Sequence, residues 1–311
     1  MAARPKVQHW VPKFYLRQFA IPETRQTDRP KVWIFSKHQG EPKLTSVRNV
    51  AARSHLYTPI GATGGRDWKM EEMLGDIESL LARLWPELTD GFADLHGQES
   101  IRKIVALFVS TLHLRHPDSI RVVVEMHENL VSLFEGCPKD AAGNPLISEV
   151  DYRGDVRPFD NSGYQAYKSA GPDEIRQMFV DGIRAHATWF AEALMEKRWS
   201  VVFSESPVFV TTDTPVAIVN RFRERFGITT PGTVVSIPLS PTRVLLMDDR
   251  NDQPQGRYYP LAAHGPAPFN LSAWHGCERF MISSRDPDEV CAEILAWTDA
   301  NPPSGRPPPS H

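Results

Sequence analysis

The order of the periodic segments constrains the fold of this 311-residue chain more than any other feature. Apolar residues recur with a helical period of about 3.6 over residues 67–135 and again over 173–198. Short β-rich runs separated by turn residues follow only later, over residues 199–247. This order predicts an α+β fold, because a parallel α/β sheet would need strands and helices in alternation.

We therefore expect a helical body packed with a small, mainly antiparallel sheet from residues 199–247. An N-terminal strand is expected to join it at residues 31–37, where KVWIFSK alternates apolar and polar residues. In the helix predicted over 67–95, Pro86 should introduce a kink or a break. The polar segment 136–172, with its prolines and glycines, is expected to be a lid or a disordered excursion.

The chain is expected to form a single α+β domain over residues 1–298. The helix predicted over 98–116 is apolar on nearly every side between Ile104 and Leu114, which favours a buried, central position. The closing sequence NPPSGRPPPSH contains too few apolar residues to pack, so a disordered Pro-rich tail is expected from residue 299 onward.

The sequence favours a cytoplasmic protein that does not enter a membrane. No apolar run approaches the ~18 residues that a membrane span requires. The basic N-terminus, MAARPKVQHW, is not followed by an apolar signal core, so secretion is not expected. The three cysteines are widely spaced and form no CxxC pair, which argues against a disulfide framework and suits a reducing compartment.

Basic residues are concentrated near the N-terminus. Residues 1–70 contain 13 Lys and Arg but only four Asp and Glu, although the whole chain has a net charge of −3. Such a segment can attract a polyanion, which predicts nucleic acid as a partner of residues 1–70. The alternative is that the segment packs against the acidic remainder of the same chain.

The sequence FVTTDTPV, residues 209–216, places a carboxylate at the end of a β-rich run. Thr214-Pro215 forces a turn, because proline disfavours a helical residue before it. Asp213 would then lie at a strand end, where a carboxylate can act as a base or a metal ligand. The alternative is an Asx-turn, in which Asp213 only accepts hydrogen bonds from neighbouring backbone amides.

Two further stretches contain residue types that carry out chemistry. In MEEMLGDIESLLARLW, Glu71 and Glu78 are seven residues apart and share one helix face, where they could bind a cation or act as acid and base. A solvent-exposed helix face is the alternative. In STLHLRHPDSI, His113 and His116 are helical neighbours beside Arg115, which could clamp an anion or pair with a glutamate. Phosphate loops, GxSxG elbows and HExxH motifs are absent from the sequence.

The succession HWVPKFYLRQFA, NVAARSHLY, EEMLGDIE, HLRHP and FVTTDTPV resembles the DUF4238 family of bacterial proteins over residues 9–283. The family opening, H-x-x-P-x-x-Y-L-x-x-F, corresponds to His9, Pro12, Tyr15, Leu16 and Phe19. Its T-[ST]-D-x-P-V pattern corresponds to Thr211, Thr212, Asp213, Pro215 and Val216. The stretch LSPTRVLLM and Asn270 also resemble the family pattern.

This resemblance brings no activity with it, but it implies a stand-alone bacterial protein, either an accessory or defence-type enzyme or a binding protein. It favours Asp213 as a site residue, with His9 and Glu78 next. It also implies that His9 forms one wall of a site that an aromatic plug, including Tyr15, holds in place. His116 departs from the family pattern, which makes Arg115 the stronger candidate of the two.

The function expected from these residues is metal-dependent hydrolysis of a phosphodiester in nucleic acid. Asp213 and Glu78 would hold Mg²⁺ or Mn²⁺, His9 would be the general base or a third ligand, and Arg115 would stabilise charge on the phosphate. Four further residues are expected to bind the substrate: Lys13, Tyr15, Arg17 and Thr212.

Two other functions remain open. In the first, the protein is a non-catalytic binding module, and the same residues form a buried network that fixes the N-terminal segment onto the sheet. In the second, it is a metal-free hydrolase or transferase that acts on a small anionic substrate such as a nucleotide.

Overall fold

The computed structural model describes residues 6–302, except for residues 39, 62–63, 148, 153–154 and 159. The helices are α1 (Lys13–Gln18), the short 3-10 helix η1 (Val47–Asn49), α2 (Lys69–Thr89), α3 (Glu99–Leu114), α4 (Ser119–Glu135), α5 (Tyr164–Lys168), α6 (Pro172–Met195), α7 (Ala267–Gly276) and α8 (Pro287–Ala300). The strands are β1 (Val7–His9), β2 (Lys31–Ser36), β3 (Lys43–Ser46), β4 (Ala52–Ser54), β5 (Glu149–Tyr152), β6 (Asp155–Pro158), β7 (Arg198–Phe203), β8 (Thr211–Thr212), β9 (Ala217–Asn220), β10 (Thr233–Ser240), β11 (Arg243–Asp248), β12 (Arg257–Pro260) and β13 (Phe280–Ser283). Helices with small, mainly antiparallel sheets confirm the predicted α+β class.

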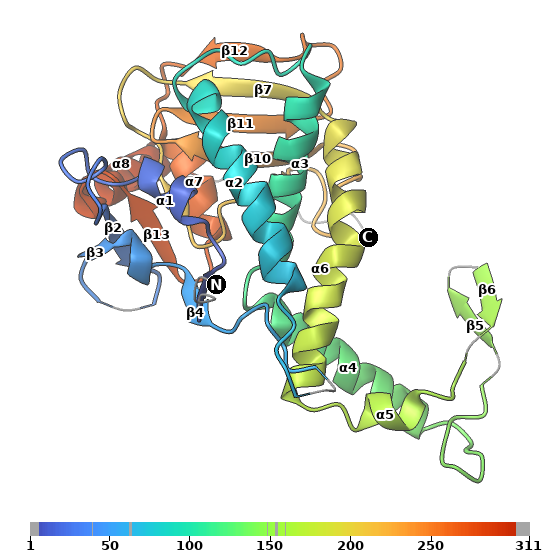
Figure 1. The fold of residues 1–311 in the computed structure, drawn as a ribbon. Coiled ribbons are helices and arrows are strands. Elements are labelled where there is room, and N and C mark those ends of the chain that lie inside the picture. The colour runs from blue at the N-terminus through green and yellow to red at the C-terminus, as the bar shows by residue number, and fades with distance from the viewer. Residues whose placement is uncertain are drawn as a thin grey trace.

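The long helices form a layer against a five-stranded sheet. In Figure 1, α2 and α3 cross the front of this sheet and α6 lies beside α3. Arg102 near the start of α3 donates to the carbonyl of Met195 (2.9 Å), and Ser110 donates to Ala187 (2.6 Å), so α3 and α6 are antiparallel. Most of α3 between Val105 and Leu112 is buried, which confirms the central position that its apolar composition predicts.

The helix predicted over 67–95 forms as α2 but is shorter and is not split at Pro86. It ends at Thr89, one turn beyond the proline. Pro86 has no amide hydrogen and so forgoes one helical hydrogen bond, and the backbone amide of Asp90 caps the helix end by donating to the Pro86 carbonyl (2.9 Å). None of the described helices, α2 included, is long and apolar enough to cross a membrane.

The strands form two main sheets rather than one. The larger has the order β12-β7-β11-β10-β9, antiparallel except between β12 and β7. The second has the order β3-β2-β13-β8 and contains the N-terminal strand. The predicted strand over 31–37 is present as β2, which pairs with β3 and β13 and shares its sheet with β8 of the 199–247 region. The alternation of apolar and polar residues identifies a strand. It does not identify the partner strands, of which β13 lies more than 200 residues away in the sequence.

The N-terminal segment connects the two sheets to the helices. Tyr15 and Phe19, on and just after α1, are fully buried beside Trp85 of α2. The Tyr15 hydroxyl is 2.7 Å from both the Thr211 hydroxyl in one sheet and the Pro238 carbonyl in the other. The aromatic plug that the sequence implies is therefore the part of the molecule at which both sheets meet.

The segment 136–172 contains α5 and the hairpin of β5 and β6. Together with α4 it forms an arm that extends from the body in Figure 1. Whether the arm acts as a lid stays a prediction, as do the domain bounds 1–298. The tail expected from residue 299 begins later, because α8 continues to Ala300, and residues 303–311 lie outside the described residues.

Candidate functional site

Trp10 lies between two polar centres and contacts both. Its backbone carbonyl accepts a hydrogen bond from Arg115 Nε (2.7 Å), and its indole Nε1 donates to the carbonyl of Asp213 (3.0 Å). We name the two groups the Asp213 centre, made of Asp213, His116, Asp118 and Arg279, and the Arg115 centre, made of Arg115, Glu78 and Glu71. Because α3 ends at Leu114 before Pro117, the adjacent residues Arg115 and His116 can enter different centres.

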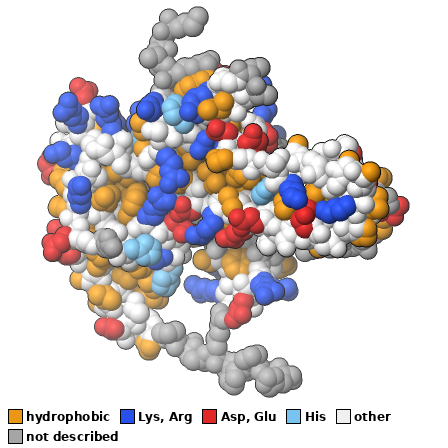
Figure 2. Space-filling model, turned by 90° about the horizontal axis from the view of Figure 1, so that it is seen from below, with side chains coloured by type: hydrophobic (Ala, Val, Ile, Leu, Met, Phe, Trp, Pro, Cys, Tyr) orange, Lys and Arg blue, Asp and Glu red, His pale blue; other side chains and the backbone are white. Residues whose placement is uncertain are grey.

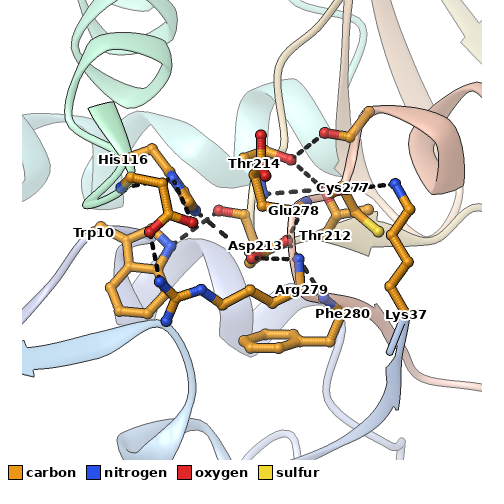
Figure 3. A network of polar contacts seen from close by, with 12 residues as sticks. Trp10, Lys37, His116, Thr212, Asp213, Thr214, Cys277, Glu278, Arg279 and Phe280 are labelled. Atoms are coloured by element: carbon orange, nitrogen blue, oxygen red, sulfur yellow. Dashed lines mark hydrogen bonds and ion pairs between the residues drawn. The ribbon is translucent and has the colours of Figure 1, made fainter. Parts of the chain in front are cut away.

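The carboxylate of the Asp213 centre is completely buried, with 0% exposure. Its two oxygens accept hydrogen bonds from the backbone amides of Glu278 (3.2 Å), Arg279 (3.0 Å) and Phe280 (3.5 Å), as Figure 3 shows. Asp213 thus receives amide donors at the start of β13, rather than from its own turn as in the Asx-turn alternative. The adjoining turn is closed by Thr212, whose hydroxyl accepts from the Thr214 amide (3.1 Å).

His116 lies on the other side of that carboxylate. The Asp118 amide donates to its Nδ1 (3.2 Å), so the hydrogen-bond pattern assigns the ring proton to Nε2, which lies 3.6 Å from Asp213 Oδ2. Asp118 also pairs with Arg279 at 2.6 Å, and the Arg279 guanidinium lies over the Trp10 ring, 5.7 Å from its centroid. Figure 3 shows these groups as one network around Asp213.

A small cavity adjoins the Asp213 centre. It measures about 220 Å³, and its lining includes His113, His116, Thr214 and Glu278. Burial is the main cause that lowers the pKa of His113 to about 4, and the neighbouring His116 contributes. Both predicted helical histidines therefore face this cavity, and His113 is neutral at physiological pH.

Within the residues that the structure describes, each centre contains one unpartnered buried nitrogen, His116 Nε2 in the Asp213 centre and a guanidinium nitrogen in the Arg115 centre. Arg115 is 1% exposed, and its Nη1 donates to Glu78 Oε1 (2.8 Å) while its backbone carbonyl accepts from the Tyr57 hydroxyl (2.8 Å). Its Nη2 is buried and has no hydrogen-bond partner within the described part of the chain. A buried donor left in this state costs about 1–3 kcal/mol, which an oxygen-rich ligand would offset.

Glu71 adds a second carboxylate to this centre. It lies in the first turn of α2, and seven residues bring Glu78 to the same helix face. Burial, followed by the charge of Glu78, raises the pKa of Glu71 to about 7, against the opposing effect of Arg115 and Lys13. Glu71 can therefore accept or release a proton near neutral pH.

A basic cleft lies on the same side of the molecule as the N-terminus. It measures about 750 Å³ and is lined by the cations Lys6, Lys13, Arg29 and Arg48 together with His9. Figure 2 shows this underside, where Lys and Arg side chains form a band beside a group of acidic ones. Among the described residues these four cations form no ion pair with a carboxylate, although the charge of Lys13 lowers the pKa of Glu71.

His9 forms part of the wall of this cleft. Its Nε2 donates to the carbonyl of Arg48 (3.2 Å), and the backbone of Val47 also interacts with the ring. Burial and the charge of Lys13 lower the pKa of His9 to about 4. A neutral imidazole of such low basicity is a poor general base at pH 7, although it can orient a substrate.

The structure brings together some of the residues expected to form a site. His9 and Lys13 line the basic cleft, and Arg115 forms an ion pair with Glu78. Both His9 and Lys13 lie near the Arg115 centre, because the charge of Arg115 lowers the pKa of His9 and the charge of Lys13 lowers that of Glu71.

The other expected substrate-binding residues lie elsewhere. Tyr15 and Thr212 are buried, and their hydroxyls bond to other parts of the protein. Arg17 donates to the carbonyl of Arg25 (3.2 Å). These three side chains hold the chain in place in this structure, and their contact with a substrate stays a prediction.

The two expected metal ligands lie in different centres. Glu78 contacts Arg115, whereas both oxygens of Asp213 accept backbone amides. No group of three or more His, Cys, Asp or Glu side chains suited to a metal ion occurs among the residues that the structure describes. A cation shared by Glu78 and Asp213 would therefore need a rearrangement around Trp10.

From the sequence, Glu71 is considered beside Glu78 but is not among the expected site residues, and Asp118 and Arg279 are not singled out. For Glu71 a signal existed, since its seven-residue distance from Glu78 is visible in the sequence. The ion pair of Asp118 with Arg279 joins positions 161 residues apart, and no local pattern predicts it.

The fold and the two centres define an α+β protein in which an N-terminal segment is fixed between two sheets by buried polar contacts. Residues 7–287 match the model of the family described as protein of unknown function (DUF4238), so the chain belongs to this family. Neither the curated proteins nor the solved structures contain a match.

Proposed function

We propose that the protein hydrolyses a phosphodiester of nucleic acid at the Arg115 centre. The observation that carries this proposal is the buried Arg115 Nη2, which lacks an acceptor while the rest of the guanidinium is fixed by Trp10 and Glu78. A phosphate oxygen is an acceptor that suits this nitrogen, because hydrogen bonds from guanidinium to a negatively charged oxygen are among the strongest in proteins.

In the proposed reaction, Arg115 stabilises the charge that develops on the phosphate. Its guanidinium is held in place before substrate arrives, so little reorganisation is required when the negative charge increases. Glu71 accepts the proton of the attacking water. With a pKa of about 7, it is a stronger base than an ordinary carboxylate and is partly deprotonated at neutral pH.

The basic cleft supplies the binding energy for a polyanion. Lys6, Lys13, Arg29 and Arg48 line it without carboxylate partners among the described residues, so a phosphate chain can replace their counterions. His9 on the cleft wall donates to Arg48 and acts in binding rather than as the base.

Mg²⁺ or Mn²⁺ belongs to the proposal as a cation that arrives with the substrate phosphate. Such ions are often bound by one or two carboxylates plus substrate oxygens rather than by a complete protein cage. This form of binding requires no cluster of three protein ligands, and it leaves Asp213 with its backbone donors.

The test is hydrolysis of single-stranded and duplex DNA and RNA, with Mg²⁺, with Mn²⁺ and with a chelator. Glu71→Gln should lower kcat by about 10²–10⁴-fold, the usual contribution of a positioned general base. Glu72→Gln, one residue along and exposed, is the matched control and should retain the wild-type rate. A wild-type protein that cleaves none of these polymers, or a Glu71→Gln protein with full activity, would refute the assignment.

The Asp213 centre favours a second candidate, a non-catalytic binding protein. Its carboxylate is saturated by backbone donors, as expected of a structural network that fixes the N-terminal segment. Cleavage distinguishes the two functions, because a binding protein retains nucleic acid without cleaving it. In that case Glu71→Gln should leave the binding unchanged.

A further inference from the structure

The loop between β9 and β10 presents alternating arginine and phenylalanine side chains to solvent. Its sequence from residue 221 is RFRERF, and every residue from Arg221 to Gly227 is exposed. Phe222 is 83% exposed and Phe226 37%. Large aromatic rings at such exposure usually mark a binding surface when they are grouped and ordered.

Side-chain hydrogen bonds hold this loop in a defined shape. The Asn220 side-chain oxygen accepts from the amides of Phe222 (2.9 Å) and Arg223 (3.1 Å), and its amide nitrogen donates to Thr233 (3.1 Å) on the other side of the loop. Ile228 anchors the loop in the core. The exposed rings are thus carried on a fixed base.

One edge of the Phe222 ring lies near Gly232, and the rest of the side chain is open to water. Gly232 has φ +81°, and a Cβ built on it would lie 2.9 Å from Phe222 Cδ2. Only glycine leaves room for the ring at this position. The result is a flat aromatic platform, and Arg221, Arg223 and Arg225 are exposed beside it.

We propose that residues 221–226 bind single-stranded nucleic acid, with Phe222 stacking on an unpaired base and the arginines contacting phosphates. Aromatic platforms within a cationic surface are the usual means of binding single strands, since every base offers a π face and every linkage a charge. A duplex hides its base faces, so stacking favours an unpaired strand. This inference rests on the proposed function and specifies the strandedness of its substrate.

The loop and the buried aromatic residues Tyr15 and Trp85 lie at opposite ends of β10, so we expect binding at the loop to depend on the length of the strand. β10 leaves the loop at Thr233 and reaches the Tyr15 and Trp85 contacts at Pro238 and Leu239. Six residues of strand span about 20 Å. A short substrate can occupy the Arg115 centre without touching Phe222, whereas a long strand can reach both.

The experiment measures fluorescence anisotropy of a labelled oligothymidylate of about 20 nucleotides, with chelator present to prevent cleavage. Phe222→Ala should weaken binding by about tenfold, the effect of losing one stacked base. Phe222→Trp should retain the affinity. Phe92→Ala is the matched control, because Phe92 is also largely exposed (68%) but lies in another loop.

Unchanged affinity in Phe222→Ala would overturn the inference. So would Phe222-dependent binding to phosphatidylserine vesicles with no binding of the oligonucleotide, which would assign the loop to an anionic membrane. Hydrolysis of bis(p-nitrophenyl) phosphate separates this inference from the proposed function: Phe222→Ala should not alter it, and Glu71→Gln should. If wild type binds the strand through Phe222 but hydrolyses nothing, only the hydrolase assignment fails.

Discussion

The two centres on either side of Trp10 contain similar residue types, but their hydrogen bonds are completed to different degrees. In the Asp213 centre, backbone amides occupy both carboxylate oxygens, and the Arg279 guanidinium pairs with Asp118. In the Arg115 centre, one guanidinium nitrogen has no acceptor within the described chain, and Glu71 has a raised pKa. In the first centre the carboxylate finds its donors within the protein, although His116 Nε2 has no hydrogen-bond partner among the described residues, whereas in the second a guanidinium nitrogen lacks an acceptor there.

This difference suggests that the Asp213 centre serves the stability of the protein and the Arg115 centre its activity. A saturated buried network stabilises one arrangement of the chain, here the N-terminal segment against β8 and β13. A centre with an orphaned donor and a carboxylate destabilised by burial and by a like charge is strained in the absence of ligand, as functional sites commonly are. We therefore expect mutations in the Asp213 centre to lower mainly the stability of the protein, and mutations in the Arg115 centre to lower mainly its activity.

The largest expected effect is on stability, at Asp213. Asp213→Ala removes the acceptor of three partly buried backbone amides, those of Glu278, Arg279 and Phe280. At about 1–3 kcal/mol for each orphaned group, the loss should be several kcal/mol, and the melting temperature should fall by roughly 10 °C or more. Thermal unfolding followed by circular dichroism measures this change.

Asp181→Ala, at an exposed site on α6, is the control and should melt like wild type. Melting of Asp213→Ala within about 2 °C of wild type would remove the distinction between the centres. The carboxylate would then be available for catalysis.

The next largest effect is expected at Arg115, where activity should fall more than stability. Arg115→Lys keeps the charge but loses the planar fork, so it should lower kcat/KM for nucleic acid by about 10²-fold or more. Because Nη2 is unpartnered, part of the structural cost is already present in wild type, and the melting temperature should change less than in Asp213→Ala. Parallel kinetic and melting measurements test this, and an activity loss equal to the fraction unfolded would contradict it.

Much of the fold could be predicted from periodicity. The apolar spacing of α2, α3 and α6 identifies each helix, and β7, β10 and β11 are visible as β-rich runs. These signals are local. The assignment of β2 to the sheet with β13 is not predictable in this way, because it joins residues about 250 positions apart.

The candidate site shows the same limit. The sequence patterns single out Arg115 and Asp213, but their separation by Trp10 depends on two contacts of a single tryptophan. The hydrogen bonds that Asp213 accepts come from backbone amides at the start of β13. Every residue except proline has such an amide, so the sequence does not show which amides will face the carboxylate. Residue types could therefore be predicted from the sequence, whereas their hydrogen-bonding state could not.

A smaller effect is expected in the pH dependence of stability. The pKa of Glu71 is raised from 4.5 to about 7, so between these values the folded state holds more protons than the unfolded state. The contribution of Glu71 is thus present at acidic pH and is lost as the pH rises toward 7. Glu71→Gln should gain stability relative to wild type over this interval, by about 1 kcal/mol or less because the side chain is partly exposed.

Urea unfolding of both proteins at pH 5 and pH 7.5 measures this difference. His9 acts in the opposite direction, since its pKa is lowered from 6.5 to about 4 and its contribution is lost as the pH falls. His9 is present in both proteins, so it cancels in the comparison. A constant difference across the two pH values would show that Glu71 is not in the strained environment assigned to the Arg115 centre.

The smallest effect concerns the basic cleft beside the Arg115 centre. Lys13→Ala should reduce the slope of log Kd against log salt concentration by about one, because one phosphate contact is lost. Arg17→Ala is the matched control on the same helix, since Arg17 already donates to Arg25 and does not line the cleft. Titration of a single-stranded oligonucleotide at several salt concentrations gives both slopes. Equal slopes for the two variants would mean that the cleft does not carry the phosphate chain, and the Arg115 centre would then lose its route for a polymeric substrate.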